Sequence, residues 1–507
     1  MITTVLRPPG ASPLTLVVGL GESGLAAARW CQRAGVAIRV ADTREAPPLL
    51  EQAREALLPG TDLRLAQGAL GAELLQDVGR VVLSPGLAWN SPELAPLLAA
   101  ARERGVEVVG EIELFNEALA ALADERSYRP AVLAITGTNG KTTVTALTTH
   151  LVNAGGRRAR AAGNIGPAAL AALIEALERD DLPEVWVLEL SSFQLEAVER
   201  LAPHAAAVLN LTEDHLDWHG TMEAYAAAKA RIYRGCRWAI VNRDDLRARA
   251  MLPRLEAQHV RSFGAELPSL AGDLGMETGS GLGWLVESAA DAFGAEPAPR
   301  RRKGDPEPGR QEGRLNRLMP AEALLLRGAH NSLNAQAALL LARSLDIGWA
   351  PLLRAVREYR GEPHRVAWLR SVGGVDFIDD SKGTNVGATL AALRGLGTKV
   401  VLIAGGDGKG QDFAPLAPAV ASHARGVVLI GRDAPRLAAA LEPSGVPCIM
   451  AASLPEAVER AMGLARAGDA VLLSPACASL DMFRDYRHRA EVFAEAVDEL
   501  ALERGEV

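Results

Sequence analysis

The chain has 507 residues and a formal net charge of −8, a length for which two to four domains are expected and three fit best. An acidic balance argues against a general nucleic-acid binder, whose footprint is a basic face. The four cysteines are scattered without metal-ligand spacing, and no apolar stretch reaches the roughly 18 residues of a membrane span. The N-terminal sequence also lacks an export signal. These features predict a cytoplasmic enzyme that neither inserts into a membrane nor binds nucleic acid.

Residues 1–125 alternate short apolar runs with Ala- and Leu-rich stretches, which predicts a βαβ series with strands at 14–18, 37–41, 81–83 and 106–109. Gly19, Gly21 and Gly24 follow the first strand in the spacing G-x-G-x-x-G, and Asp42 closes the next strand. Such glycines allow a tight turn and a close approach of the backbone to a pyrophosphate. The fingerprint alone leaves NAD and other pyrophosphate ligands open.

A phosphate-binding loop, residues 136–143, follows the apolar run 131–135. Lys141 can place a point charge on a phosphate, and the Thr142 hydroxyl can bind Mg²⁺. Ile135 stands where the usual G-x-x-x-x-G-K-[ST] pattern has glycine, so the loop is a variant. The chain has only six lysines, and Lys382 and Lys409 are also kept in Gly- or Asp-rich segments, which indicates a task for a compact ammonium group.

Two further strands of the central region are predicted at 185–190 and 205–209. Glu189 lies at the carboxyl end of the first, where it could share Mg²⁺ with Thr142 or cap the next helix. After the second, His215 could bind a metal ion or accept a proton, whereas His219 is expected in a solvated loop. Lys229 lies in an Ala-rich helical stretch that could bury its amine and lower its pKa, although an ordinary surface lysine is the commoner outcome of such spacing.

The central domain is predicted to span residues 126–360, with a flexible, Pro-, Gly- and Arg-rich surface insertion at 296–317. Near its end, Asn331 and Asn334 share one helical face and could either read an adenine edge or cap the helix. The third domain, 361–507, has predicted strands at 375–379, 400–404, 427–430 and 470–473, and three of its strand-end loops converge on one edge. Cys477 lies in one of these loops and is expected to be structural. The predicted fold class is α/β with three doubly wound domains: Rossmann-like, P-loop ATPase-type and again Rossmann-like.

Together these motifs resemble those of the ATP-dependent Mur ligase family of peptidoglycan synthesis over essentially the whole chain. Residues 137–142 and the pair His330-Asn331 with Asn334 are similar to the family as a whole, which includes folylpolyglutamate synthases. The strings at 188–195 (LELSSFQL), 379–385 (DDSKGTN) and 474–479 (SPACAS) resemble the branch that adds D-glutamate to UDP-N-acetylmuramoyl-L-alanine. The resemblance implies a ligase that serves cell-wall biogenesis, cell shape and cell division.

The resemblance also implies a mechanism, in which ATP phosphorylates the substrate carboxylate and the D-glutamate amine attacks the acyl phosphate. It implies Lys141, His215 and Lys229 as catalytic residues, and Mg²⁺ ligands Thr142, Glu189, His215 and a carbamylated Lys229. The implied ATP-binding residues are Gly137, Thr138, Asn139, Gly140, Lys141, Thr142, Thr143, Asn331, Asn334, Arg365 and Asp380. The implied UDP-substrate residues are Glu22, Ser23, Asp42, Thr43, Arg44, Ser84, Asn164 and His215. The implied D-glutamate residues are Lys382, Thr384, Ser479 and Tyr486, the last at a position that commonly carries Phe.

On this interpretation the glycines of the first domain serve uridine diphosphate rather than NAD. Two departures from the family pattern are the insertion 296–317 and Gly383, where Ala is more usual. A sibling ligase for another amino acid, a nucleotide-gated binding protein and a NAD oxidoreductase are the competing hypotheses. We also expect a monomer, in which closure of the third domain about Gly361 brings its groups onto the central ATP site.

Overall fold

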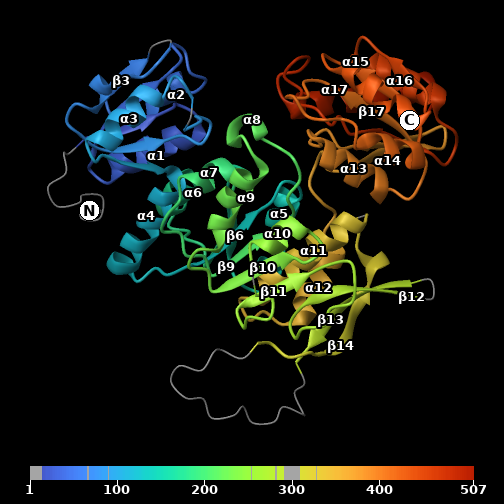
Figure 1. The fold of residues 1–507 in the computed structure, drawn as a ribbon, viewed down its shortest axis with the longest axis horizontal. Coiled ribbons are helices and arrows are strands. Elements are labelled where there is room, and N and C mark those ends of the chain that lie inside the picture. Colours follow the sequence, from blue (N-terminus) through green and yellow to red (C-terminus); the bar gives the residue numbers. More distant parts are fainter. Residues whose placement is uncertain are drawn as a thin grey trace.

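The computed structural model describes residues 14–65, 68–89, 91–252, 254–279, 282–290, 309–326 and 328–506. Figure 1 shows three α/β domains in chain order, with the first and third standing on the central one and helix α8 rising between them. Each domain is built around a sheet whose strands are parallel or nearly all parallel. The predicted fold class is therefore confirmed.

The first domain has a five-stranded parallel sheet in the order β3-β2-β1-β4-β5. Strand β1 lies in the middle, with β2 and β3 added on one side and β4 and β5 on the other, so the direction of strand addition reverses at β1. Such a reversal leaves a crevice beyond the carboxyl ends of β1 and β4. The strands are β1 (Leu14–Val18), β2 (Ala37–Asp42), β3 (Asp62–Leu65), β4 (Val78–Leu83) and β5 (Glu107–Gly110). The helices are α1 (Glu22–Arg33), α2 (Leu50–Ala56), α3 (Ala95–Glu103) and α4 (Glu111–Arg126).

The central domain has a six-stranded parallel sheet in the order β11-β10-β9-β6-β8-β7. Its strands are β6 (Ala131–Thr136), β7 (Ala159–Gly163), β8 (Val185–Glu189), β9 (Ala205–Val208), β10 (Trp238–Asn242) and β11 (Val260–Phe263). Its helices are α5 (Lys141–Ala154), α6 (Ala169–Glu178), α7 (Ser192–Glu196), α8 (Leu216–His219), α9 (Met222–Ala230), α10 (Leu246–Ala250), α11 (Ala329–Arg343) and α12 (Trp349–Glu358). Strand β6 is flanked by β8 and β9, so the loops that carry the predicted site all start from neighbouring strands.

A small antiparallel sheet, β12-β13-β14, is appended to the central domain. Its strands are β12 (Leu274–Gly279), β13 (Leu282–Ala289) and β14 (Arg314–Pro320). Residues 291–308, which include most of the predicted insertion 296–317, lie outside the described residues. The described part of the insertion, residues 309–317, does not match the predicted flexibility. Residues 314–317 pair with β13, and Arg310 is buried with its guanidinium 2.6 Å from Asp273.

The third domain has a six-stranded sheet in the order β15-β16-β20-β17-β18-β19, in which only β15 is antiparallel to its neighbour. The strands are β15 (Ala367–Val372), β16 (Val375–Asp379), β17 (Val400–Gly405), β18 (Ala424–Ile430), β19 (Cys448–Met450) and β20 (Ala470–Leu473). The helices are α13 (Val386–Gly395), α14 (Leu416–His423), α15 (Ala434–Leu441), α16 (Leu454–Leu464) and α17 (Tyr486–Glu503). Apolar side chains on the two faces of the sheet form two separate buried clusters.

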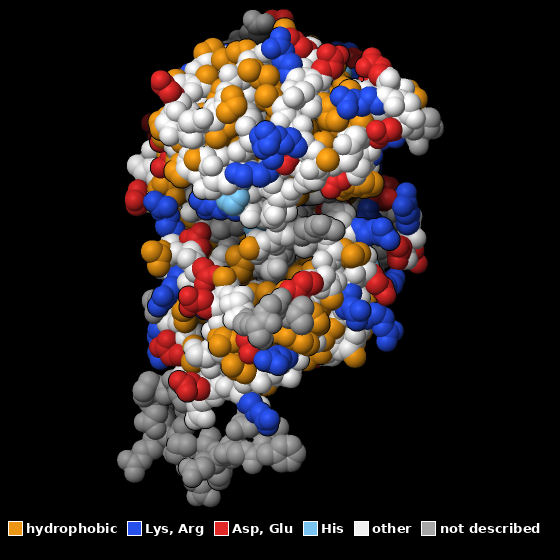
Figure 2. Space-filling view, turned by 90° about the vertical axis from the view of Figure 1, so that its right-hand side faces the viewer, with side chains coloured by type: hydrophobic (Ala, Val, Ile, Leu, Met, Phe, Trp, Pro, Cys, Tyr) orange, Lys and Arg blue, Asp and Glu red, His pale blue; other side chains and the backbone are white. Residues whose placement is uncertain are grey.

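The central and third domains meet at a narrow waist. Figure 2 shows this waist from the side of the third domain, as a constriction between two lobes. At the waist, Asn385 Nδ2 of the third domain donates a 3.1 Å hydrogen bond to Asn139 Oδ1 of the central domain. The strand-end loops of the two domains therefore face each other. Among the described residues, no helix combines the length and apolar character needed to cross a bilayer.

Candidate active site

The phosphate-binding loop joins β6 to α5 in the way the sequence predicts. Gly137 and Gly140 have positive φ values of 155° and 82°, which a residue with a Cβ adopts only under strain. A Cβ on Gly140 would also lie 2.5 Å from Asn334 Oδ1. Lys141 Nζ donates hydrogen bonds of 2.9 and 2.8 Å to the carbonyl oxygens of Gly137 and Thr138. Burial lowers the pKa of Lys141, although Glu189 and Asp214 act in the opposite direction.

Glu189 ends β8 next to this loop, in register with Ile135 of β6. Its side chain is buried, and Oε1 accepts a 2.7 Å hydrogen bond from Asn164 Nδ2. Its other oxygen, Oε2, is buried and has no hydrogen-bond partner among the described residues. Burying an unpaired carboxylate oxygen is costly, and a divalent cation with oxygen ligands would offset that cost. The nearby Thr142 hydroxyl is buried as well, so the two side chains fit the oxygen set that Mg²⁺ prefers. The alternative that Glu189 caps α7 is not needed, because Ser191 caps that helix with a capping box.

Lys229 lies directly under the phosphate loop. Only 1% of the residue is exposed, and Nζ donates to Gly137 O at 2.9 Å and to Thr136 Oγ1 at 3.2 Å. Nζ also lies 4.7 Å from the centre of the Tyr225 ring. Burial, with a further contribution from the Lys141 ammonium, holds the pKa of Lys229 well below its usual value. Spacing alone favoured an ordinary surface lysine at this position, and that prediction is therefore wrong.

His215 is the N-cap residue of α8 and has a positive φ of 54°. Its Nε2 lies 3.6 Å from Asp214 Oδ2, and its ring centre lies 4.6 Å from that of Phe193. Burial lowers the pKa of His215, with further lowering by Lys409, Lys141 and Lys229. A neutral imidazole suits both a metal ligand and a proton acceptor.

His219 is not the solvated loop residue that was expected. Its ring stacks on Phe193 with centres 5.7 Å apart, and Nε2 lies 2.9 Å from Ser192 Oγ. This packing contributes to holding the short helix α8 against α7.

The asparagine pair lies in the first two turns of α11. Both side chains are buried, and Asn334 Nδ2 donates to Asn331 Oδ1 at 3.0 Å. The close approach of Asn334 to Gly140 places this pair against the phosphate loop. The N-cap residue of α11 is Gly328, with no side-chain cap, so capping does not explain the two amides.

Arg365 and Asp380 come from the start of the third domain and the end of β16. Asp380 is buried, with Oδ2 accepting a 2.7 Å hydrogen bond from Ser474 Oγ. Burial raises the pKa of Asp380 to about 7, against the effects of Ser474 and Arg365. The Nε of Arg365 is buried, and no described residue forms a hydrogen bond with it. The charges of Arg365 and Lys382 both lower the pKa of Lys141, so these residues face the phosphate loop across the waist.

The residues predicted to bind D-glutamate line one end of the third domain's sheet. Lys382 Nζ lies 5.0 Å from the centre of the Tyr486 ring. Burial lowers the pKa of Lys382, and Arg365 lowers it further. Ser479 is buried and Thr384 is half-buried in neighbouring loops. The predicted convergence of these loops is present.

The predicted UDP-substrate residues fall into two groups. In the first domain, Asp42 accepts a 2.6 Å hydrogen bond from Leu20 N and pairs with Arg44, and Ser84 Oγ donates to Gly19 O at 2.9 Å. Hydrogen bonds from Arg44 and from the backbone lower the pKa of Asp42 despite its burial. A cavity of about 800 Å³ next to them is lined by Thr43, Arg44 and, from α8, Trp218. Glu22 and Ser23 begin α1 at the same edge. Asn164, in contrast, lies in the central domain against Glu189.

Two residues at the waist were not assigned a role from sequence. Asn385 binds Asn139 and also caps α13, accepting from Ala388 N at 2.9 Å. Lys409 follows β17, and its charge lowers the pKa of His215 across the domain boundary. The scarcity of lysine singled out Lys409, but no sequence signal pointed to the partner of Asn385.

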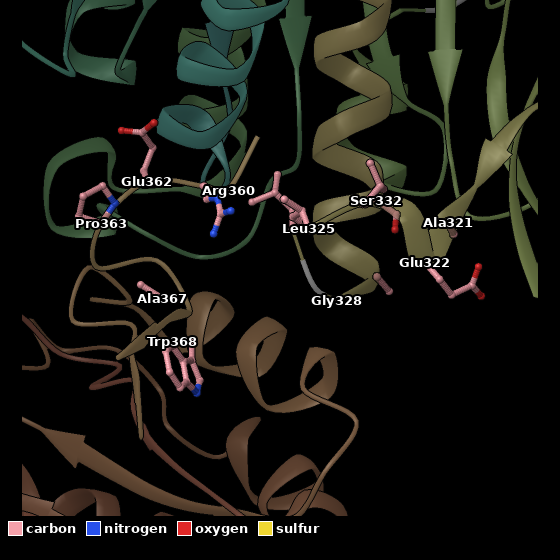
Figure 3. Close-up of a pocket in the computed structure, with 14 residues that line it drawn as sticks. Ala321, Glu322, Leu325, Gly328, Ser332, Arg360, Glu362, Pro363, Ala367 and Trp368 are labelled. Atoms are coloured by element: carbon pink, nitrogen blue, oxygen red, sulfur yellow. The ribbon is translucent and has the colours of Figure 1, made fainter. Parts of the chain in front are cut away.

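A second cavity lies at the hinge between the central and third domains (Figure 3). It has a volume of about 840 Å³, and its walls include Leu325 and Ser332 above and Trp368 below, with Arg360 and Glu362 in the linker. It is bounded by the first turns of α11, beside the asparagine pair.

Three segments of the chain match sequence profiles of one family: the MurD-like N-terminal domain of Mur ligases over residues 14–110, the Mur ligase middle domain over 135–277 and the Mur ligase glutamate ligase domain over 364–477. With a phosphate loop facing a third α/β domain, the chain belongs to the Mur ligase family, whose members form amide bonds at the expense of ATP. The predicted family is confirmed.

Curated relatives narrow the comparison to one branch. The chain is 63% identical over 499 residues to UDP-N-acetylmuramoylalanine–D-glutamate ligase of Bordetella parapertussis, covering 98% of both chains. It is 53% identical over 498 residues to the ligase of that name from Burkholderia pseudomallei, covering 97% of this chain and 98% of the other.

Solved structures support the fold. UDP-N-acetylmuramate–alanine ligase MurC of Thermotoga maritima has a TM-score of 0.56 at 19% identity, covering 96% of this chain and 99% of its own. MurF of Acinetobacter baumannii has a TM-score of 0.55 at 17% identity, covering 86% and 91%.

Proposed function

We propose that this chain joins D-glutamate to UDP-N-acetylmuramoyl-L-alanine, with conversion of ATP to ADP and phosphate. The full-length relatives bear the name of this activity. The observation that carries the proposal in the structure is the buried Lys229 amine under a phosphate loop, next to the unpartnered Glu189 oxygen. A protein that only binds nucleotides has no need for this second site. The sibling ligases are disfavoured by the strings shared with the D-glutamate branch.

The proposed reaction has two steps. A carboxylate oxygen of the L-alanine moiety takes the γ-phosphoryl group of ATP, which gives ADP and an acyl phosphate. The neutral amine of D-glutamate then attacks the acyl carbon, and the tetrahedral intermediate collapses with loss of inorganic phosphate and a proton. Lys141 and the backbone N–H groups of the loop stabilise charge on the transferred group. The adenosine and the phosphates would be held by Asn331, Asn334, Arg365 and Asp380.

Mg²⁺ would be held by Thr142 and Glu189, and a second ion by His215 and Lys229. When bound, the ions supply charge neutralisation between the phosphates and the attacking carboxylate. Lys229 fits the second role only after carbamylation, because an ammonium repels a cation. Its lowered pKa favours the neutral amine that reacts with carbon dioxide. The carbamate then presents oxygens where the free amine has one nitrogen.

The remaining residue sets complete the proposal. Glu22, Ser23, Asp42, Thr43, Arg44, Ser84 and Asn164 would hold the UDP-sugar, and Lys382, Thr384, Ser479 and Tyr486 the carboxylates of D-glutamate. We further propose the domain boundaries 125/126 and 360/361, a monomeric state and a cytoplasmic location, where ATP is available.

The test is phosphate release from ATP with UDP-N-acetylmuramoyl-L-alanine, comparing D-glutamate, L-glutamate, L-alanine and a diamino acid. We expect release with D-glutamate alone. Release with another amino acid instead would assign the chain to a sibling branch, and no release with any would favour a nucleotide-gated binding protein.

A further inference from the structure

Tyr486 brings a hydroxyl group to the loops where D-glutamate is proposed to bind. It is the first residue of α17, whose N-cap is Asp485. The Tyr486 hydroxyl accepts a 3.2 Å hydrogen bond from Nε of Arg487. The Lys382 ammonium lies over the same ring, 5.0 Å from its centre. One phenol thus lies between two cations.

Arg487 packs against the same ring. Its guanidinium carbon is 5.5 Å from the centre of the Tyr486 ring. The residue is exposed on the first turn of α17. Arg487 therefore contacts Tyr486 through both the hydroxyl and the ring.

We infer that Arg487 is a positioning residue, which fixes the Tyr486 side chain and thereby the Lys382 ammonium that lies over its ring. This inference rests on the proposed function and extends it to a residue outside the proposed binding sets. A lysine side chain has several free torsions, and their ordering before substrate arrives reduces the entropy cost of binding.

The other arginines of this region have different partners. Arg489 is fully buried, and its guanidinium donates to Ser381 O and Cys477 O, so it holds loops together. Arg484 is exposed and lies 3.9 Å from Glu491, with which it forms an ion pair. It lies three positions before Arg487 and provides a matched control.

The experiment compares steady-state constants of the wild-type protein with those of Arg487→Ala, Tyr486→Phe, the double variant and Arg484→Ala. We expect Arg487→Ala and Tyr486→Phe each to raise the KM for D-glutamate roughly two- to fivefold, in the range of partly exposed polar pairs. The KM for ATP should be unchanged. The double variant should show no further rise in the KM for D-glutamate, because each single change already removes the same hydrogen bond. Arg484→Ala should match the wild type, and thermal unfolding should confirm that all variants fold.

A wild-type protein without D-glutamate-dependent phosphate release would overturn both the proposed function and this inference. An active wild type with an unchanged KM in Arg487→Ala, or with multiplicative effects of Arg487→Ala and Tyr486→Phe, would overturn this inference alone.

Discussion

Asn385 of the third domain donates a 3.1 Å hydrogen bond to Asn139 in the phosphate loop of the central domain. The backbone approaches closely at the same place, because a Cβ on Gly387 would lie 2.9 Å from Thr212 Oγ1 and 3.0 Å from Asn139 Nδ2. Both neighbours belong to the central domain. Gly387 therefore permits the contact by which the third domain meets the phosphate loop.

Gly387→Val should separate these two domains. The added methyl groups collide with Thr212 and Asn139, and displacement of about 1 Å in a catalytic arrangement can reduce turnover roughly 100-fold. We expect a drop of that order in kcat and a larger radius of gyration by small-angle scattering with an ATP analogue and UDP-substrate bound. The control is Gly463→Val, in helix α16, where a Cβ meets open space. Equal scattering profiles and equal kcat for both variants would contradict a role for this contact.

Lys229→Ala should abolish most activity and regain part of it with added short carboxylates such as acetate. The reason is that a carboxylate can supply the oxygens that we assign to the carbamate, and loss of such a ligand costs on the order of 10- to 100-fold or more. Lys399→Ala is the control, since Lys399 is an exposed residue before β17 whose ammonium donates to Ser422 O. Labelled bicarbonate should give a carbamate signal in the wild type that Lys229→Ala lacks. Failure of rescue together with no carbamate signal would rule out this role.

Glu189→Gln should weaken the response to Mg²⁺ without weakening the fold. The amide keeps an oxygen to accept from Asn164 but removes the charge of the unpartnered Oε2. We expect the Mg²⁺ concentration for half-maximal activity to rise roughly 10- to 100-fold, with an unchanged or higher midpoint of thermal unfolding. Glu184→Gln, at the exposed start of the same strand, should change neither. An unaltered Mg²⁺ response in Glu189→Gln would exclude it as a ligand.

The features predicted correctly from the sequence are those encoded by residues close together along the chain. The phosphate loop, the apolar strands that precede it and follow it, and the sheet edge where Glu189 lies were all predicted. Strands β3 and β7 were not predicted, because short runs such as Asp62–Leu65 and Ala159–Gly163 carry few large apolar side chains. The antiparallel strands β12–β14 were also missed, since polar side chains cover much of β14.

Properties that depend on tertiary packing were beyond the sequence. Lys229 lies in a helix rich in alanine, where every face looks alike, so its burial could not be decided from spacing. His219 was expected in a solvated loop, although its ring packs on Phe193 and Tyr225 in space. The contact of Asn385 with Asn139 joins residues 246 positions apart, and no local pattern encodes it.

The buried Asp380 should make both nucleotide binding and stability depend on pH. Its pKa of about 7 in the folded protein lies above the roughly 3.9 of an exposed aspartate. Between about pH 4 and 7, the Asp380 carboxyl is therefore protonated in the folded state and ionised in the unfolded state. The contribution of Asp380 to the free energy of unfolding falls as pH rises from about 4 to 7 and is constant above 7. Asp380→Asn should remove this decline.

The same titration predicts the behaviour of ATP binding. If the ionised carboxylate accepts hydrogen bonds from the nucleotide, protonation removes that acceptor, and the KM for ATP should rise roughly tenfold for each pH unit below about 7. In Asp380→Asn the KM for ATP should be higher at pH 8 and nearly independent of pH. Asp376→Asn, on the exposed side of the same strand, should keep the wild-type profile. A wild-type profile in Asp380→Asn as well would assign the titration to another group.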